Sequence, residues 1–218
     1  MKSLAKETFF YGMGSVLPKL LSWFLSLYWA FALPRVDDIG VLTNFYAWVA
    51  LLQVILTYGM ETGFFRFANK ESDPARVFST TFISILSSTL LFFVIALIFL
   101  EPVAFALGGT QMKPHYLLLM VLILCFDVVG AIPFANLRFK KRPIRFAAIK
   151  MVNVGLTILI NLFFFLVCPL LQERFPDAFV WFDLSRGVDY ILIANLIASV
   201  VQLLMVSPEL RIRFTFDK

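Results

Sequence analysis

Long apolar segments recur along the whole chain. They cover about residues 8–33, 39–64, 78–100, 116–137, 144–169 and 188–207. Each is near or above the length of about 20 residues that a helix needs to cross the hydrocarbon core of a bilayer. The segments are continuous, whereas the strands of a membrane β-barrel are short and alternate apolar with polar positions. The pattern predicts an all-α polytopic membrane protein in which six transmembrane helices form one unit over residues 1–218.

The composition supports this class. Hydrophobic residues make up 61% of the chain and charged residues 15%, whereas soluble domains are roughly half apolar and about a quarter charged. Cys125 and Cys168 lie in apolar segments, which indicates neither a disulfide framework nor a metal cluster. The single histidine, His115, is expected to lie at the membrane surface. Because no P-loop and no catalytic set is visible, we expect neither an enzyme nor a cofactor.

The basic residues predict the orientation. With the N-terminus in the cytoplasm, the inner side receives thirteen of them and the outer loops only four, Arg35, Lys113, Arg174 and Arg186. Cytoplasmic loops carry the excess of Lys and Arg, so both termini are expected inside. In a membrane protein this placement explains the net charge of +5 without a nucleic-acid partner. The inner residues are Lys2, Lys6, Arg66, Lys70, Arg76, Arg138, Lys140, Lys141, Arg142, Arg145, Arg211, Arg213 and Lys218.

Four ionisable residues lie inside the predicted spans. They are Lys19, Glu61, Asp127 and Lys150, and Arg66 lies at the inner boundary of the second span. Each costs about 2.5–3.5 kcal/mol at the centre of a membrane helix, so such groups remain where they meet each other, water or a substrate. Depth along the helices predicts two pairs, Lys19 with Asp127 and Glu61 with Lys150. The alternative is that these charges only fix the register of the helices.

Polar and small residues follow the helical period on four spans. Such stripes must point away from lipid, either into a helix interface or onto a water-filled cavity. For the serines the helix interface is the simpler interpretation; for the charged members a transport role is favoured. The stripes are Gly12, Ser15, Lys19, Ser22 and Ser26; Tyr46, Gln53, Thr57 and Glu61; Lys150, Asn153, Thr157 and Asn161; and Asn195, Ser199 and Gln202.

Helix breakers lie close to the charged residues. Pro18 precedes Lys19, Pro133 follows Asp127, and Gly59 and Gly63 lie four residues apart in the second span. Kinks at these points would let the helices bend during gating. Ala30-Phe31-Ala32 has the form of a signal-peptidase site, but the charged region before it is long for a signal peptide, so the first span is expected to be retained.

Six motifs stand out from the general hydrophobic pattern. They are Gly12-Met-Gly-Ser-Val-Leu-Pro-Lys-Leu-Leu-Ser, Ile39-Gly-Val-Leu, Tyr58-Gly-Met-Glu-Thr-Gly-Phe-Phe-Arg-Phe, Val77-Phe-Ser-Thr, Ala131-Ile-Pro-Phe-Ala-Asn-Leu-Arg and Arg142-Pro-Ile-Arg-Phe. They resemble the amino-terminal half of bacterial polysaccharide biosynthesis proteins of the oligosaccharide flippase type, within the multidrug, oligosaccharidyl-lipid and polysaccharide exporter superfamily. Relatives carry two lobes of six helices, so this chain resembles one lobe without the second. Tyr28-Trp29-Ala30 departs from the more polar run of many relatives.

The resemblance implies a flippase that moves an undecaprenyl-pyrophosphate-linked oligosaccharide across the bacterial cytoplasmic (inner) membrane by alternating access, for polysaccharide or lipopolysaccharide synthesis. Cationic partners for the pyrophosphate would be Lys19, Lys150 and Arg66. Ser22 and Asn153 belong to the stripes that would bind sugar hydroxyls. Glu61 or Asp127 would titrate or bind a coupling cation, H⁺ or Na⁺. Further expected partners are membrane lipids and a second lobe or a second copy of the chain.

Three alternatives remain. A multidrug exporter of the same superfamily would favour acidic and aromatic cavity residues over lysines, since its substrates are usually cationic. A membrane-embedded glycan polymerase or acyltransferase would need a catalytic histidine or acidic motif near a membrane face. A scaffold half that transports nothing is expected only if the chain ends naturally at Lys218.

Overall fold

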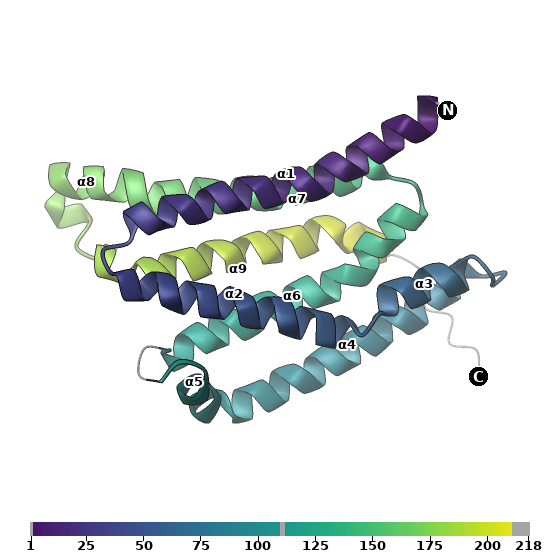
Figure 1. Ribbon diagram of the computed structural model, residues 1–218, viewed down its shortest axis with the longest axis horizontal. Coiled ribbons are helices and arrows are strands. Elements are labelled where there is room, and N and C mark those ends of the chain that lie inside the picture. The colour runs from purple at the N-terminus through teal and green to yellow at the C-terminus, as the bar shows by residue number, and fades with distance from the viewer. Residues whose placement is uncertain (1, 110–111, 211–218) are drawn as a thin grey trace.

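The computed structural model describes residues 2–109 and 112–210, with side chains from residue 12 on except at 36 and 108. Every regular element within these ranges is helical, and the long helices run along the longest axis of the molecule (Figure 1). The α-helices, long and short, are α1 (Lys2–Ala32), α2 (Val36–Thr57), α3 (Met60–Ala68), α4 (Pro74–Ile98), α5 (Leu100–Gly108), α6 (Pro114–Phe139), α7 (Pro143–Leu162), α8 (Cys168–Arg174) and α9 (Gly187–Val206).

Within the described ranges, five segments are long and apolar enough to cross a membrane. They are Asp37–Ala68, Pro74–Ile98, Pro114–Phe139, Pro143–Arg174 and Leu184–Leu210, and they contain the second to sixth expected spans almost completely. The expected span 8–33 falls in α1, which has 31 residues but is not one of the five; Pro18, Lys19 and several serines lower its hydropathy. The chain is therefore a multi-pass helical membrane protein, and the six-span lobe stays a prediction.

Proline sets the start of three long helices. Pro74, Pro114 and Pro143 occupy the first turns of α4, α6 and α7, where a missing backbone N–H costs nothing and the fixed φ suits a helix. The α4 start is also capped, because the Asp73 carboxylate accepts a hydrogen bond of 3.0 Å from the Ala75 N–H.

The expected helix breakers behave differently from one another. The helix is interrupted between α2 and α3, where Tyr58 and Gly59 have φ of 31° and 72°. Glycine takes this left-handed conformation without strain, whereas tyrosine does not. Pro18 and Pro133, by contrast, lie inside the uninterrupted helices α1 and α6, as membrane helices tolerate proline where neighbours satisfy the freed backbone groups. Of the three expected kink sites, the glycine step interrupts its span.

Neighbouring helices form the series α1, α7, α9, α6 and α4, and α2 packs mainly on α6. At the start of the series α1 lies very close to α7, because a Cβ on Gly14 would be 2.9 Å from Cα and Cβ of Ala147. Small residues permit this approach between membrane helices. The core surrounds α6, whose Leu124, Ile132 and Leu137 are fully buried. Helix α6 is thus the scaffold, and α1 is attached to it through α7 and α9.

The connections alternate between the two ends of the bundle. The α3–α4 and α6–α7 connections lie at one end, and the α1–α2 and α8–α9 connections at the other (Figure 1). Eight of the basic residues expected inside, from Arg66 to Arg145, fall on or beside the first end. The other five, Lys2, Lys6, Arg211, Arg213 and Lys218, lie outside the described side chains. The arrangement therefore separates the expected inner and outer charges along one axis.

Candidate functional site

A pocket of about 500 Å³ lies between α1 and α7. Helix α1 contributes Lys19 and Ser22 to it, and α7 contributes Lys150 and Asn153. These two pairs belong to the polar stripes of the first and fifth expected spans. The other described lining residues are Gly14, Ser15, Pro18, Phe146 and Val154, so the described part of the lining contains no carboxylate. Two ammonium groups from facing helices therefore make it a cationic chamber.

A second pocket of about 340 Å³ adjoins the first, since Lys19 and Ser22 line both. Its walls come from α1, α2, α7 and α9, and they include Trp29, Tyr46 and Asn195. The Trp29 and Tyr46 rings are stacked, with centroids 6.0 Å apart and planes 7° apart. Aromatic rings flanked by amide and hydroxyl groups offer both apolar faces and hydrogen-bonding partners, so we name this pocket the aromatic chamber.

Hydrogen bonds hold the aromatic chamber in shape. Trp29 Nε1 donates to Asn161 Oδ1 over 2.9 Å, and Asn195 Nδ2 donates to the Tyr46 hydroxyl over 2.9 Å. These bonds tie α1 to α7 and α2 to α9. The walls are therefore organised without a ligand.

Lys19 and Ser22 stand where the two chambers meet, and their polar atoms have no side-chain partner among the described residues. The local sequence places them there, because positions 19, 22, 26 and 29 follow one face of α1 at helical spacing. Both residues are exposed on α1, so inside a membrane their polar atoms would need water, a ligand or another protein surface. The junction is therefore the point of the cavity best suited to contact a polar ligand.

A hydrogen-bonded chain leads from the cationic chamber into the core. Lys150 Nζ donates to Gln202 Oε1 over 3.2 Å, and Gln202 Nε2 donates to Asp127 Oδ1 over 3.4 Å. Asp127 also accepts a hydrogen bond from Ser199, and the Lys150 ammonium lies 4.3 Å from the centroid of the Phe134 ring. Gln202 thus links a pocket-lining cation to a carboxylate on the scaffold helix.

Neither expected charge pair forms a direct ion pair among the described residues, although Glu61 still acts on Lys150 electrostatically. Glu61 Oε2 lies 2.6 Å from Arg138 Nη2, and Asp127 is connected to Lys150 through Gln202 rather than to Lys19. Depth along a helix does not say which helices are neighbours. Because α7 and α9 lie between α1 and α6 in the packing series, Lys19 and Asp127 do not meet.

Of the residues expected to bind substrate, Lys19, Ser22, Lys150 and Asn153 line one pocket, as just described. Arg66 is different, because it is exposed on α3 and lines neither chamber. The residues expected to couple an ion, Glu61 and Asp127, also lie outside the two linings. The structure therefore brings together the binding residues of the first and fifth spans only.

Sequence reasoning missed a charge cluster at the α6–α7 connection. The Glu209 side chain is only 3% exposed and meets Arg145 at 2.7 Å and Lys140 and Arg142 at 3.1 Å. We define these four residues as the Glu209 cluster. The available signal was a single acidic residue just after the last span, on the same expected side as a run of basic residues. The cluster joins the end of α9 to the start of α7.

The opposite end of the bundle has its own contacts. His115 Nε2 lies 2.8 Å from Asp189 Oδ1, and the His115 side chain is 50% exposed. In the adjacent loop, hydrogen bonds from Ser185 hold the pKa of Asp183 below its ordinary value. Among the described residues, no group of three or more His, Cys, Asp or Glu is placed to hold a metal ion. The His115 contact joins the starts of α6 and α9.

Trp29, Tyr46 and Asn195 form the other part of the site that the sequence did not single out as a unit. Tyr46 and Asn195 were visible only as members of two polar stripes, and their meeting with Trp29 depends on helix packing.

Comparison with protein-family models, with curated proteins and with solved structures finds no match for this chain. The two chambers are therefore the features of this chain that bear on its function.

Proposed function

We propose that this chain is one lobe of a flippase that moves a lipid-linked oligosaccharide, carried on undecaprenyl pyrophosphate, across the bacterial cytoplasmic membrane. It is proposed to act by alternating access and to carry out no covalent chemistry. The observation that carries the proposal is the pair of adjoining chambers, one cationic and one aromatic, that share Lys19 and Ser22.

The cationic chamber suits the pyrophosphate. Hydrogen bonds between ammonium groups and phosphate oxygens are charge-assisted and about twice as strong as neutral ones. Lys19 and Lys150 approach from two helices, and the lining residues that the structure describes include no carboxylate to compete for them. A multidrug exporter for cationic substrates would need the opposite charge in this chamber.

The aromatic chamber suits the saccharide. Sugar rings combine apolar C–H faces with hydroxyl groups, and the lining combines indole and phenol rings with the amide of Asn195 and the hydroxyl of Thr157. Lys19 and Ser22, shared by both chambers, would then bind near the bond between phosphate and sugar. The two adjoining chambers would thus hold the pyrophosphate and the saccharide side by side, as these groups are linked in a lipid-linked oligosaccharide.

The chain from Lys150 through Gln202 to Asp127 offers a route for coupling. A proton or Na⁺ on Asp127 would weaken the hydrogen bond from Gln202 to Asp127. Gln202 could then move, and Lys150, which donates to Gln202, would shift in the cationic chamber. We propose that this change favours one access state over the other. A second lobe, or a second copy of the chain, is proposed to cover the exposed side of α1, which faces away from α7. The end that carries the α6–α7 connection is proposed to face the cytoplasm.

A binding experiment on the purified full chain tests the proposal. Undecaprenyl-pyrophosphate-linked oligosaccharide is titrated while tryptophan fluorescence is followed, because Trp23 and Trp29 line the aromatic chamber. We expect Lys19→Gln to weaken binding about tenfold or more, which corresponds to about 1.4 kcal/mol. The matched control is Lys70→Gln, an exposed lysine remote from the chambers, which is expected to bind normally.

A cellular experiment tests transport. In a bacterium whose surface glycan depends on this chain, Lys19→Ala and Asp127→Ala are each expected to abolish glycan export while the protein remains in the membrane. Normal export by both variants would contradict the role of the charged cavity. Binding of a cationic drug in preference to the glycolipid would favour the multidrug alternative instead.

A further inference from the structure

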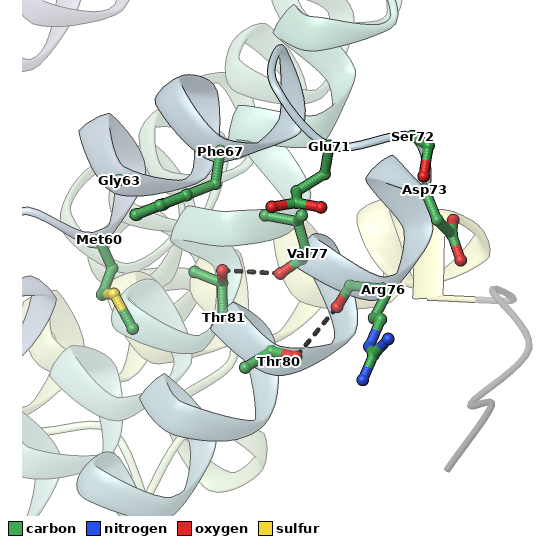
Figure 2. Close-up of a pocket in the computed structure, with 10 residues that line it drawn as sticks. All are labelled: Met60, Gly63, Phe67, Glu71, Ser72, Asp73, Arg76, Val77, Thr80 and Thr81. Atoms are coloured by element: carbon green, nitrogen blue, oxygen red, sulfur yellow. Dashed lines mark hydrogen bonds between the residues drawn. The ribbon is translucent and has the colours of Figure 1, made fainter. Parts of the chain in front are cut away.

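A third pocket, of about 570 Å³, lies between α3, α4 and the turn that joins them (Figure 2). It has no lining residue in common with the two chambers. It is located where the spanning segment Asp37–Ala68 ends and the segment Pro74–Ile98 begins. In a bilayer this is the level at which acyl chains give way to headgroups.

The wall of this pocket is apolar. Met60 and Phe67 extend from α3 toward α4, and Val77 lies opposite them (Figure 2). Thr80 and Thr81 add no free donor, because their hydroxyls donate to the carbonyls of Arg76 and Val77 over 3.1 and 2.7 Å. Gly63 leaves space, since a Cβ built there would have no neighbour within 4 Å. The wall therefore fits a hydrocarbon chain.

The rim of the pocket carries charges of both signs. Glu71 and Arg76 are exposed, and neither pairs with a described residue. Figure 2 shows the Glu71 carboxylate and the Arg76 guanidinium pointing in different directions rather than at each other. A third rim residue, Asp73, is engaged as the cap of α4. The rim can thus meet a cationic and an anionic group of the same ligand.

We propose that this pocket binds one zwitterionic phospholipid of the ethanolamine type. Its ammonium group lies on Glu71, its phosphate is near Arg76, and the first part of an acyl chain packs on Met60, Phe67 and Val77. An ammonium group donates hydrogen bonds to a carboxylate, which the quaternary group of a choline lipid cannot do. An anionic lipid, or the pyrophosphate of the proposed substrate, could approach Arg76 but would offer no cation to Glu71 and would be repelled by Glu71 and Asp73. The site is independent of the proposed transport function.

Native mass spectrometry of the purified full chain tests this site. The protein is released from detergent after incubation with phosphatidylethanolamine, phosphatidylcholine or phosphatidylglycerol of identical acyl chains. We expect phosphatidylethanolamine to be retained about tenfold better than either of the others. Glu71→Gln is expected to reduce its retention to the level of phosphatidylcholine. Glu101→Gln, which changes an exposed glutamate on α5, is the matched control and is expected to leave retention unchanged.

A second variant tests the apolar wall. Gly63→Leu places a side chain in the open space of the pocket and is expected to lower retention of the lipid even with Glu71 intact, while circular dichroism shows an unchanged helix content. Equal retention of the three lipids would overturn the proposal and leave only non-specific surface lipid. A preference for phosphatidylglycerol, or unchanged retention by Glu71→Gln, would overturn it too, because Glu71 would then not select the headgroup. Retention by Gly63→Leu at the wild-type level would overturn it as well.

Discussion

The Glu209 cluster and the cationic chamber use the same residue types in opposite ways. In the cluster, three basic side chains share a carboxylate that is almost completely buried. In the chamber, two lysines share a lining in which no carboxylate occurs among the described residues. A buried carboxylate that is supplied with cations holds helices together, because removing either partner leaves an uncompensated charge. Lys19 and Lys150 have no ion-pair partner among the described residues, although Lys150 donates a hydrogen bond to Gln202. Their charges are therefore not neutralised by a neighbouring carboxylate as the charge of Glu209 is by its cations.

The largest expected effect comes from breaking the cluster. Glu209→Gln removes the negative charge that three basic residues share and is expected to lower the free energy of unfolding by about 2–3 kcal/mol. The measurement is denaturant-induced unfolding of the purified chain in detergent. Glu173→Gln, at an exposed position near the end of α8, is the control and should leave stability unchanged. An equally stable Glu209→Gln variant would show that the cluster does not hold α7 to α9.

A smaller effect is expected from the link between chamber and core. Gln202→Leu keeps a similar volume but removes the hydrogen bonds to Lys150 and Asp127, and the expected loss of stability is about 1–2 kcal/mol. The same unfolding assay measures it. Gln53→Leu, on the exposed face of α2, serves as the control. If the two variants unfold alike, Gln202 does not connect the lysine to the carboxylate.

The smallest of the three effects concerns the aromatic chamber. Trp29→Phe keeps an aromatic ring beside Tyr46 but removes the indole N–H that donates to Asn161. We expect a loss of about 1 kcal/mol in the free energy of unfolding. Trp48→Phe, a partly exposed tryptophan of α2, should change it much less. A reversed order of the two variants would mean that the hydrogen bond from α1 to α7 contributes little.

The sequence predicted which residues share the polar face of α1, but it did not predict which residues pair with the charged side chains. Lys19 and Ser22 were expected on one stripe, and they do face a common cavity, because the helical period fixes which residues share a face. Glu61 was assigned to Lys150 from depth alone, yet Arg138 is its partner. The contacts of Glu209 were not predicted, because its position after the last span, on the side of the basic run, does not show that three basic residues from another connection surround it.

What the sequence determined by itself is the helical, membrane-spanning character of the chain and the faces of its helices. These follow from local rules, because a backbone in lipid must satisfy its own hydrogen bonds and a helix repeats every 3.6 residues. Only the tertiary structure decided which helices are neighbours. The close contact of Gly14 with Ala147 and the position of α9 between α6 and α7 set the partners of each charge. Such packing depends on the shapes of surfaces far apart in the chain, which no segment specifies alone.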